Sequence, residues 1–292
     1  MPDELKPEDY AEPRCVLCDE PYGAAPQVKA VPQRRIVEKL DEYMGRRDYA
    51  GAERHLLYWL EEARLGGDLR GELMVRNELI GHFRKTGKKE EAMAQIDAAM
   101  DLLKKLDYEG SISSGTTYTN AGTACNAFGD NVRAAGYLER ARAIYEAAPA
   151  ARPELLGGLY NNLALTYVSL GRFEEAYALY DKAMAAMDKV PGGVLEQAIT
   201  CLNRANALEA QLGLEQAESR IFDLLDEAEV LLNQGRPAPG SDAPEPGYYA
   251  FVCEKCAPTF GYYGYFAAAR ELEERSQAIY AAANAHEPWR PV

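Results

Sequence analysis

Residues 160–183 read YNNLALTYVSLGRFEEAYALYDKA, and this stretch decides the fold. Apolar residues recur at steps of three and four on both sides of Gly171, which is the spacing of one buried face on an α-helix. Glycine reaches the left-handed backbone region without a steric cost, so Gly171 predicts a tight turn between two helices. The stretch therefore predicts a helical hairpin.

The same pattern recurs along the chain. Gly87, Gly129, Gly171 and Gly213 follow one another at intervals of 42 residues, and one further step back leads to Gly45 in a similar context. The positions matched around Gly129 hold Tyr118, Ala121, Gly122, Cys125, Ala134, Leu138 and Ala141. A fixed period of this size is the signature of a repeat array, in which each unit packs on its neighbours.

The order of large, small and aromatic residues in 160–183 resembles the tetratricopeptide repeat, which normally has about 34 residues. The longer step of this chain resembles the variant of kinesin light chains, in which extra residues lengthen the second helix and the connector. The resemblance covers roughly residues 33–287 and is weakest at both ends. It implies an all-α fold, a right-handed α-α superhelix of about six hairpins whose first helices line a concave face.

Proline and glycine mark the divisions of the chain. Residues 1–32 contain six prolines and no helical stripe, so we expect an N-terminal arm there. The repeat array follows as residues 33–287, with an insertion at 235–247 before the last hairpin and a tail at 288–292. Pro258 lies inside a predicted helix of that last hairpin, and it predicts a kink or a break.

Composition narrows the classes of partner. The net charge is −14 and the sequence pI is about 4.8, without a basic cluster, so direct binding to nucleic acid is not expected. No apolar segment approaches the roughly 20 residues that span a bilayer. The first residues lack the basic and then apolar order of a secretory signal, so a cytoplasmic protein is expected.

Asparagine recurs at exposed positions of the predicted first helices. It is a poor helix former, costing about 0.5 kcal/mol relative to alanine, so its repeated use suggests that the amide matters. An amide both donates and accepts, and can pair with the backbone of an extended peptide. The candidate peptide-binding residues are Asn77, Arg84, Thr119, Asn120, Thr123, Asn126, Asn161, Asn162, Leu165, Val168, Asn203 and Arg204.

The resemblance implies a ladder of asparagines that holds a peptide, and it makes Asn120, Asn161 and Asn162 the best candidates. The alternative is that these amides tie neighbouring helices together or face water. Arg84, Lys85 and Arg204 do not reproduce the arrangement of a clamp for a terminal carboxylate, so such a ligand is disfavoured.

The cysteines form two C-x-x-C pairs, Cys15 with Cys18 and Cys253 with Cys256. Four thiolates could hold zinc, and the first pair alone could be redox active. The second pair occupies core positions of a predicted helix, where free cysteine behaves as a small apolar residue. Ordinary thiols are therefore favoured, and the four cysteines stay weak metal candidates.

Aromatic residues gather in residues 247–266. They could form a pocket for a partner, or they could seal the end of the array with large side chains. Sealing is the favoured interpretation.

No pattern of a catalytic site is present. The three histidines lie outside metal and nucleophile motifs, and no glycine-rich phosphate loop occurs. The sequence therefore predicts a non-catalytic scaffold without a cofactor, which binds a protein or an extended peptide. The alternative is a peptide-sensing regulator whose superhelix changes on binding, and self-association, including the arm in its own groove, stays open.

Overall fold

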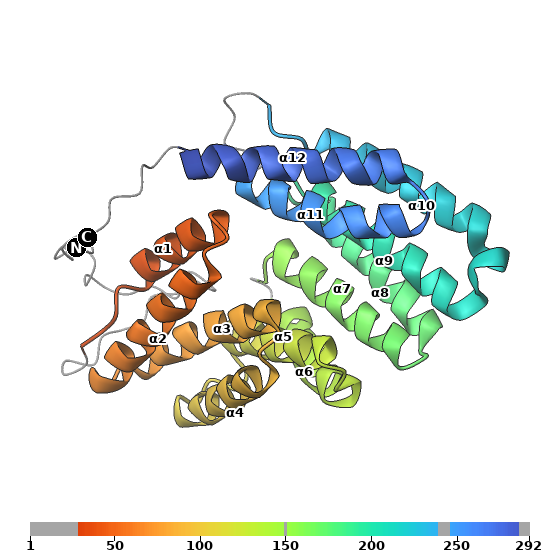
Figure 1. The fold of residues 1–292 in the computed structure, drawn as a ribbon. Coiled ribbons are helices and arrows are strands. Elements are labelled where there is room, and N and C mark those ends of the chain that lie inside the picture. The colour runs from red at the N-terminus through yellow and green to blue at the C-terminus, as the bar shows by residue number, and fades with distance from the viewer. Residues whose placement is uncertain (1–28, 149–150, 239–245, 286–292) are drawn as a thin grey trace. The chain divides into compact units, whose positions relative to one another are not determined.

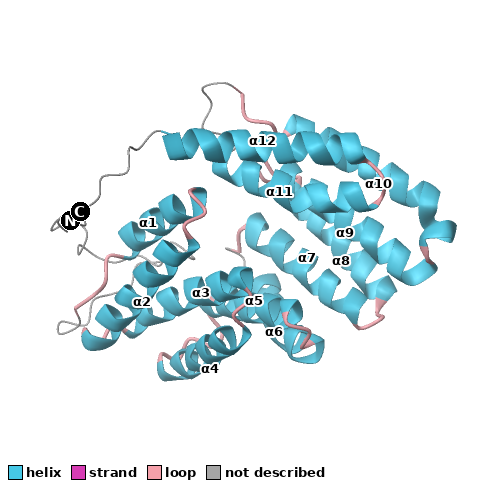
Figure 2. Cartoon of the chain, in the orientation of Figure 1, coloured by secondary structure: helices cyan, strands magenta, loops and turns pink. Residues whose placement is uncertain are grey.

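The computed structural model describes residues 29–148, 151–238 and 246–285. In these ranges the chain forms twelve α-helices and no β-strand (Figure 2). The helices pair in sequence into six hairpins, which confirms the predicted all-α hairpin repeat. Their bounds are α1 Gln33–Gly45, α2 Tyr49–Leu65, α3 Leu69–Thr86, α4 Lys89–Lys105, α5 Ile112–Ala127, α6 Asn131–Ala147, α7 Pro153–Ser169, α8 Phe173–Met187, α9 Val194–Leu212, α10 Leu214–Gln234, α11 Pro246–Tyr262 and α12 Phe266–Ala285.

Contacts divide the chain into two compact units, each with three hairpins (Figure 1). Unit 1 contains α1–α6, and its first helices α3 and α5 contact each other. Unit 2 contains α7–α12, and α9 contacts both α7 and α11. The twelve candidate residues stand on α3 and α5 in unit 1 and on α7 and α9 in unit 2. We call the side of these helices that carries them the first-helix face of that unit.

The turn glycines behave as the period predicts. Gly87, Gly129 and Gly171 have φ of 74°, 82° and 73°. The residue after each one closes the turn with a backbone hydrogen bond, as from Asp130 N to Cys125 O at 2.9 Å. Only glycine takes this backbone conformation without cost, so these three glycines fix where their hairpins reverse.

The first hairpin departs from this register, and the expectation of a turn glycine at Gly45 is wrong. Gly45 is the last residue of α1, and Arg47 takes the left-handed conformation with φ of 57°. Asp48 N bonds to Tyr43 O at 2.9 Å, the same closure that follows Gly129. The turn therefore closes two residues later than the period predicts. Its left-handed position is held by an arginine, for which this backbone conformation is strained.

Small residues allow the helices of a hairpin to approach closely. Ala134, Ala164 and Ala176 are fully buried. A Cβ on Gly122 would lie 2.5 Å from Cγ of Leu138 and 3.1 Å from the carbonyl oxygen of Ala134. The absence of a side chain at Gly122 thus sets the spacing between α5 and α6.

Pro258 does not interrupt its helix, so the expectation of a break there is wrong. Helix α11 runs through it from Pro246 to Tyr262. The proline is exposed, whereas Cys256, Ala257 and Phe260 beside it are buried in the core of unit 2. Packing on the buried side keeps the helix continuous although Pro258 lacks an amide proton.

The predicted arm, insertion and tail fall largely outside the described residues. Of the arm, Val31 is buried, and its N–H donates to Asp68 Oδ2 at 3.0 Å. Cys15 and Cys18 lie outside the described ranges. None of the described helices combines the length and the apolar character that a membrane crossing requires.

Candidate peptide-binding face

The twelve candidate residues lie on four first helices. Helix α3 carries Asn77 and Arg84, and α5 carries the four candidates from Thr119 to Asn126. Helices α7 and α9 of unit 2 carry the others: Asn161, Asn162, Leu165, Val168, Asn203 and Arg204. Within each unit the structure brings one pair of asparagines from neighbouring helices into contact.

In unit 1, Asn77 links the two first helices. Its Nδ2 donates to Leu73 O at 2.9 Å and to Thr117 Oγ1 at 3.0 Å, and its Oδ1 accepts from Asn120 Nδ2 at 3.2 Å. Asn77 is 1% exposed, whereas Asn120 is half-buried. Asn77 is thus used inside the array, and Asn120 is the member of the pair that a ligand can reach.

The other polar candidates of α5 stand on the same side as Asn120. Thr119 and Thr123 are half-buried and donate their hydroxyls to carbonyls one turn back, at 2.9 and 2.8 Å. Their oxygen lone pairs therefore remain available as acceptors. Asn126 is half-buried, and its side chain has no partner among the described residues.

Arg84 occupies the position on α3 that corresponds to Asn126 on α5. Arg84 is exposed. No carboxylate of the described residues pairs with it. Arg84 therefore offers a charged donor to an acidic group.

A carboxyl group with a raised pKa lies on α3 of unit 1. Burial, and then the nearby carboxylate of Asp41, raise the pKa of Glu78 to about 7. Glu78 is half-buried on α3, directly after Asn77. Near neutral pH it therefore exists in both forms, and the neutral form can donate a hydrogen bond.

In unit 2 the asparagine pair has a strict repeat spacing. Asn203 Nδ2 donates to Asn161 Oδ1 at 3.0 Å. Asn161 is 6% exposed, and Asn203 is half-buried. Asn162, Leu165 and Val168, all half-buried, provide an amide and two apolar side chains nearby on α7.

Arg204 is engaged by its own unit. Its Nη1 lies 3.0 Å from Asp181 Oδ1 of α8, and the Asp181 side chain is exposed. The guanidinium is therefore already paired, which reduces its capacity to select an acidic ligand.

Thr117 is a member of this arrangement that the sequence did not indicate. It is fully buried on α5, its hydroxyl donates to Ser113 O at 3.1 Å, and it accepts from Asn77. Thr117 lies 40 residues after Asn77 rather than one repeat length, so an alignment by the period does not pair the two.

The described cysteines behave as core residues. Cys253 and Cys256 are buried in the core of unit 2, and burial raises the pKa of the Cys256 thiol to about 12. Among the described residues no group of three or more metal-binding side chains forms. A thiol of this kind stays protonated near neutral pH and is a poor metal ligand in that form.

The aromatic end of the chain mainly seals unit 2. Tyr249, Phe260 and Tyr263 are buried in the core. Four hydroxyls donate to carboxylates of the preceding hairpin, joining Tyr248 to Glu196, Tyr262 and Tyr263 to Glu209, and Tyr265 to Asp226. Tyr262 and Phe266 remain 67% and 73% exposed at the turn between α11 and α12.

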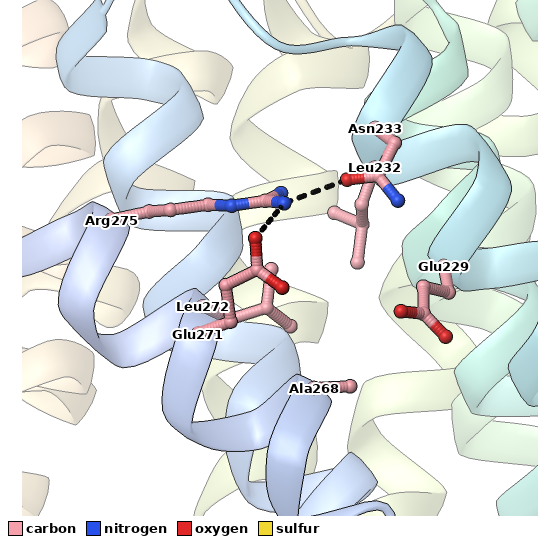
Figure 3. Close-up of a pocket in the computed structure, with 7 residues that line it drawn as sticks. All are labelled: Glu229, Leu232, Asn233, Ala268, Glu271, Leu272 and Arg275. Atoms are coloured by element: carbon pink, nitrogen blue, oxygen red, sulfur yellow. Dashed lines mark hydrogen bonds and ion pairs between the residues drawn. The ribbon is translucent and has the colours of Figure 1, made fainter.

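A small pocket lies between α10 and α12 (Figure 3). Arg275 reaches across it and donates to Asn233 Oδ1 at 2.8 Å and to Tyr249 Oη at 2.9 Å, and it pairs with Glu271. The arginine thereby joins the two second helices. The pocket is lined by second helices rather than by the first-helix face, and Arg275, Asn233 and Glu271 in it already bind one another.

Comparisons with known proteins bear on the fold. No family model matches the sequence, and no curated protein matches it. A crystal structure of a Rap protein complexed with Competence and Sporulation Factor is similar at a TM-score of 0.57 and 15% identity, over 87% of this chain. This chain spans 65% of the Rap chain's length.

Two further structures have lower TM-scores. A kinesin-light-chain-like protein of Podosopora anserina with nearly identical TPR-like repeats aligns at 0.46 and 19% identity, covering 74% of this chain and 97% of its own. BtubC (BKLC) from P. vanneervenii aligns at 0.47 and 17% identity, covering 90% of this chain and 96% of its own. Six successive hairpins in the described residues, five of them with a turn glycine at positive φ, and the likeness to the Rap structure agree with the sequence pattern. The chain therefore has a helical-repeat fold of the tetratricopeptide type.

Proposed function

We propose that this chain is a non-catalytic scaffold that binds an extended peptide or protein segment on the first-helix face of each unit. The observation that carries the proposal is the use of asparagine on successive first helices. In each unit one asparagine is buried and accepts from the next, and accessible amides such as Asn120 and Asn162 stand beside them. Amides that retain donors and acceptors suit the backbone of an extended chain.

The residues divide into two roles under this proposal. Direct contacts come from the accessible side chains Arg84, Thr119, Asn120, Thr123, Asn126, Asn162, Leu165, Val168, Asn203 and Arg204. Asn77 and Asn161 act by holding their neighbours, because their side chains are buried. In unit 1 the contacts are polar, whereas Leu165 and Val168 give unit 2 an apolar component.

A cytoplasmic protein partner fits the other properties of the chain. The net charge of −14 repels phosphate backbones, which argues against nucleic acid as a direct partner. The Rap protein was crystallised with Competence and Sporulation Factor, which supports ligand binding by this kind of fold.

Selection from a displayed library of random linear peptides on the immobilised full-length chain tests the proposal. We expect peptides that bind the wild type and lose most of their affinity for the double variant N120A/N162A. The matched control is Gln277→Ala, which removes an exposed amide from second helix α12. A selection that yields no peptide, or peptides that bind the double variant as well as the control, would overturn the proposal.

A further inference from the structure

We infer that buried Asn77 and Thr117 fix the orientation of the Asn120 amide, so that Asn120 presents an acceptor to a backbone N–H of the bound peptide. This inference rests on the proposed function for its peptide. The orientation itself follows from hydrogen bonds within unit 1.

The order of donors and acceptors begins at a backbone carbonyl. Leu73 O can only accept, so the atom of Asn77 that lies 2.9 Å from it must be the nitrogen. The hydroxyl proton of Thr117 is used on Ser113 O at 3.1 Å, so Thr117 Oγ1 accepts the second N–H of Asn77 at 3.0 Å. Both amide protons of Asn77 are therefore committed.

The next step passes this order to the accessible residue. Because both N–H groups of Asn77 already donate, only its Oδ1 can bond to Asn120. The atom of Asn120 that lies 3.2 Å from this oxygen must therefore be the donor, Nδ2. The opposite orientation of Asn120 would place two carbonyl oxygens against each other. Neither Oδ1 of Asn120 nor its second N–H has a partner among the described residues, and the side chain is half-buried.

The ligand chemistry follows from the groups that remain. An amide with its oxygen and one N–H available can form a pair of hydrogen bonds with one residue of an extended peptide, accepting from that residue's N–H and donating to its C=O. Because Asn77 fixes which atom is the acceptor, the peptide N–H must lie at Oδ1. Asn120 thus reads the direction of the bound backbone and is indifferent to its side chains.

Unit 2 repeats only part of this arrangement. Asn203 donates to Asn161 as Asn120 donates to Asn77. Thr200, three residues before Asn203 as Thr117 is before Asn120, is buried and donates to Glu196 O at 2.9 Å. Asn77 donates to Leu73 O and to Thr117. Among the described residues Asn161 forms neither equivalent bond, that is, none to Thr200 and none to a carbonyl of its own helix. The fixed orientation is therefore a property of unit 1.

The orientation is tested without a ligand on the full chain labelled with ¹⁵N-asparagine. We expect the two Nδ2 protons of Asn120 to differ in exchange rate, because only one is bonded to Asn77. Thr117→Val keeps the branched shape but removes the acceptor, and should reduce this difference, whereas Thr117→Ser keeps the hydroxyl and should preserve it. Equal exchange of the two protons in the wild type, or no response to Thr117→Val, would overturn the inference.

The consequence for binding is tested with a peptide selected on the wild type, in which each backbone N–H in turn is replaced by N-methyl. One replacement should weaken binding by about 10-fold in the wild type and by less than about 2-fold in Asn120→Ala, because the variant has already lost that hydrogen bond. Thr117→Val should weaken the unmethylated peptide by about 5-fold, and Thr117→Ser should restore it. N-methyl effects that are equal in the wild type and Asn120→Ala would refute the inference. If no peptide is selected, the proposed function fails, and the exchange experiment still decides whether the orientation is fixed.

Discussion

The Nδ2 of Asn203 donates to the Oδ1 of Asn161, the residue 42 positions earlier, at 3.0 Å. One repeat step along the chain therefore corresponds to one side-chain hydrogen bond between neighbouring first helices, α7 and α9. The acceptor of this bond is shielded from solvent, since Asn161 is 6% exposed, and its donor Asn203 is half-buried. An asparagine at this position thus contributes to the packing of the array before any ligand is considered.

Removal of this bond should lower stability measurably. We expect Asn161→Ala to reduce the free energy of unfolding by about 1–2 kcal/mol, because Asn203 loses its acceptor in a partly buried place. Asn162→Ala is the matched control on the same helix, with the same gain in helix propensity and no side-chain hydrogen bond to lose among the described residues. Urea denaturation measures both variants. Equal stability of the two would show that the bond has no net value.

The close approach of α5 and α6 predicts opposite effects for two glycines. Gly122→Ala should destabilise the protein by about 1–3 kcal/mol, since its Cβ would lie 2.5 Å from Leu138 Cγ. Gly136→Ala, on the exposed side of α6 with nothing within 4 Å, should stabilise it by about 0.5–1 kcal/mol. Thermal unfolding monitored by circular dichroism distinguishes the two. A neutral Gly122→Ala would mean that the helices separate at little cost.

The left-handed turn positions give a second pair of opposite changes. Gly171→Ala should cost about 1 kcal/mol, because alanine at φ of 73° is strained although space is available. Asp107→Gly should gain about 0.5–1 kcal/mol, because Asp107 holds a φ of 53° at an exposed turn. Chemical denaturation of both variants checks the signs. Changes of the same sign would contradict backbone strain as the common cause.

The raised pKa of Glu78 predicts a pH-dependent stability. Its pKa rises from 4.5 in the unfolded chain to about 7 in the fold, so the folded state binds more protons between these values. Stability from this group is therefore present at low pH and is lost as the pH rises from about 4.5 to 7. Glu78→Gln should stabilise the protein at pH 8 by about 1–2 kcal/mol and have less effect at pH 5.

Urea denaturation at pH 5 and pH 8 measures the Glu78→Gln effect. Glu90→Gln, at an exposed position at the start of α4, is the control for loss of a carboxylate. A stabilisation by Glu78→Gln that is the same at both pH values would show that the carboxylate does not titrate in this range.

The hairpins could be predicted because their signals are local. A glycine at the turn and apolar residues at helical spacing are read from one segment, and Gly87, Gly129 and Gly171 have the predicted backbone conformation. The turn after α1 could not be predicted in this way, because Arg47 adopts the left-handed conformation that the period assigns to Gly45. The continuity of α11 through Pro258 likewise depends on tertiary packing around that helix.

The candidate site was predictable in its position but not in its division of roles. The repeat spacing indicates which residues share a helix face, and all twelve candidates lie on α3, α5, α7 and α9. It does not indicate that Asn77 is buried and bonded to Thr117, because Thr117 is out of register with it. The raised pKa of Glu78 also arises from burial and from Asp41 on another helix.

The tyrosines of α11 and of the following turn have a consequence for the order of unfolding. Stability in a stacked array is approximately the sum of its neighbouring interfaces, so an end repeat with one interface is the first to fray. Here the interface between the last two hairpins has directional hydrogen bonds in addition to apolar packing. Tyrosine hydroxyls donate in it to the carboxylates of Glu196, Glu209 and Asp226. Such bonds oppose swivelling of the last hairpin as well as its detachment. Loss of structure in unit 2 should consequently start away from its carboxyl-terminal repeat.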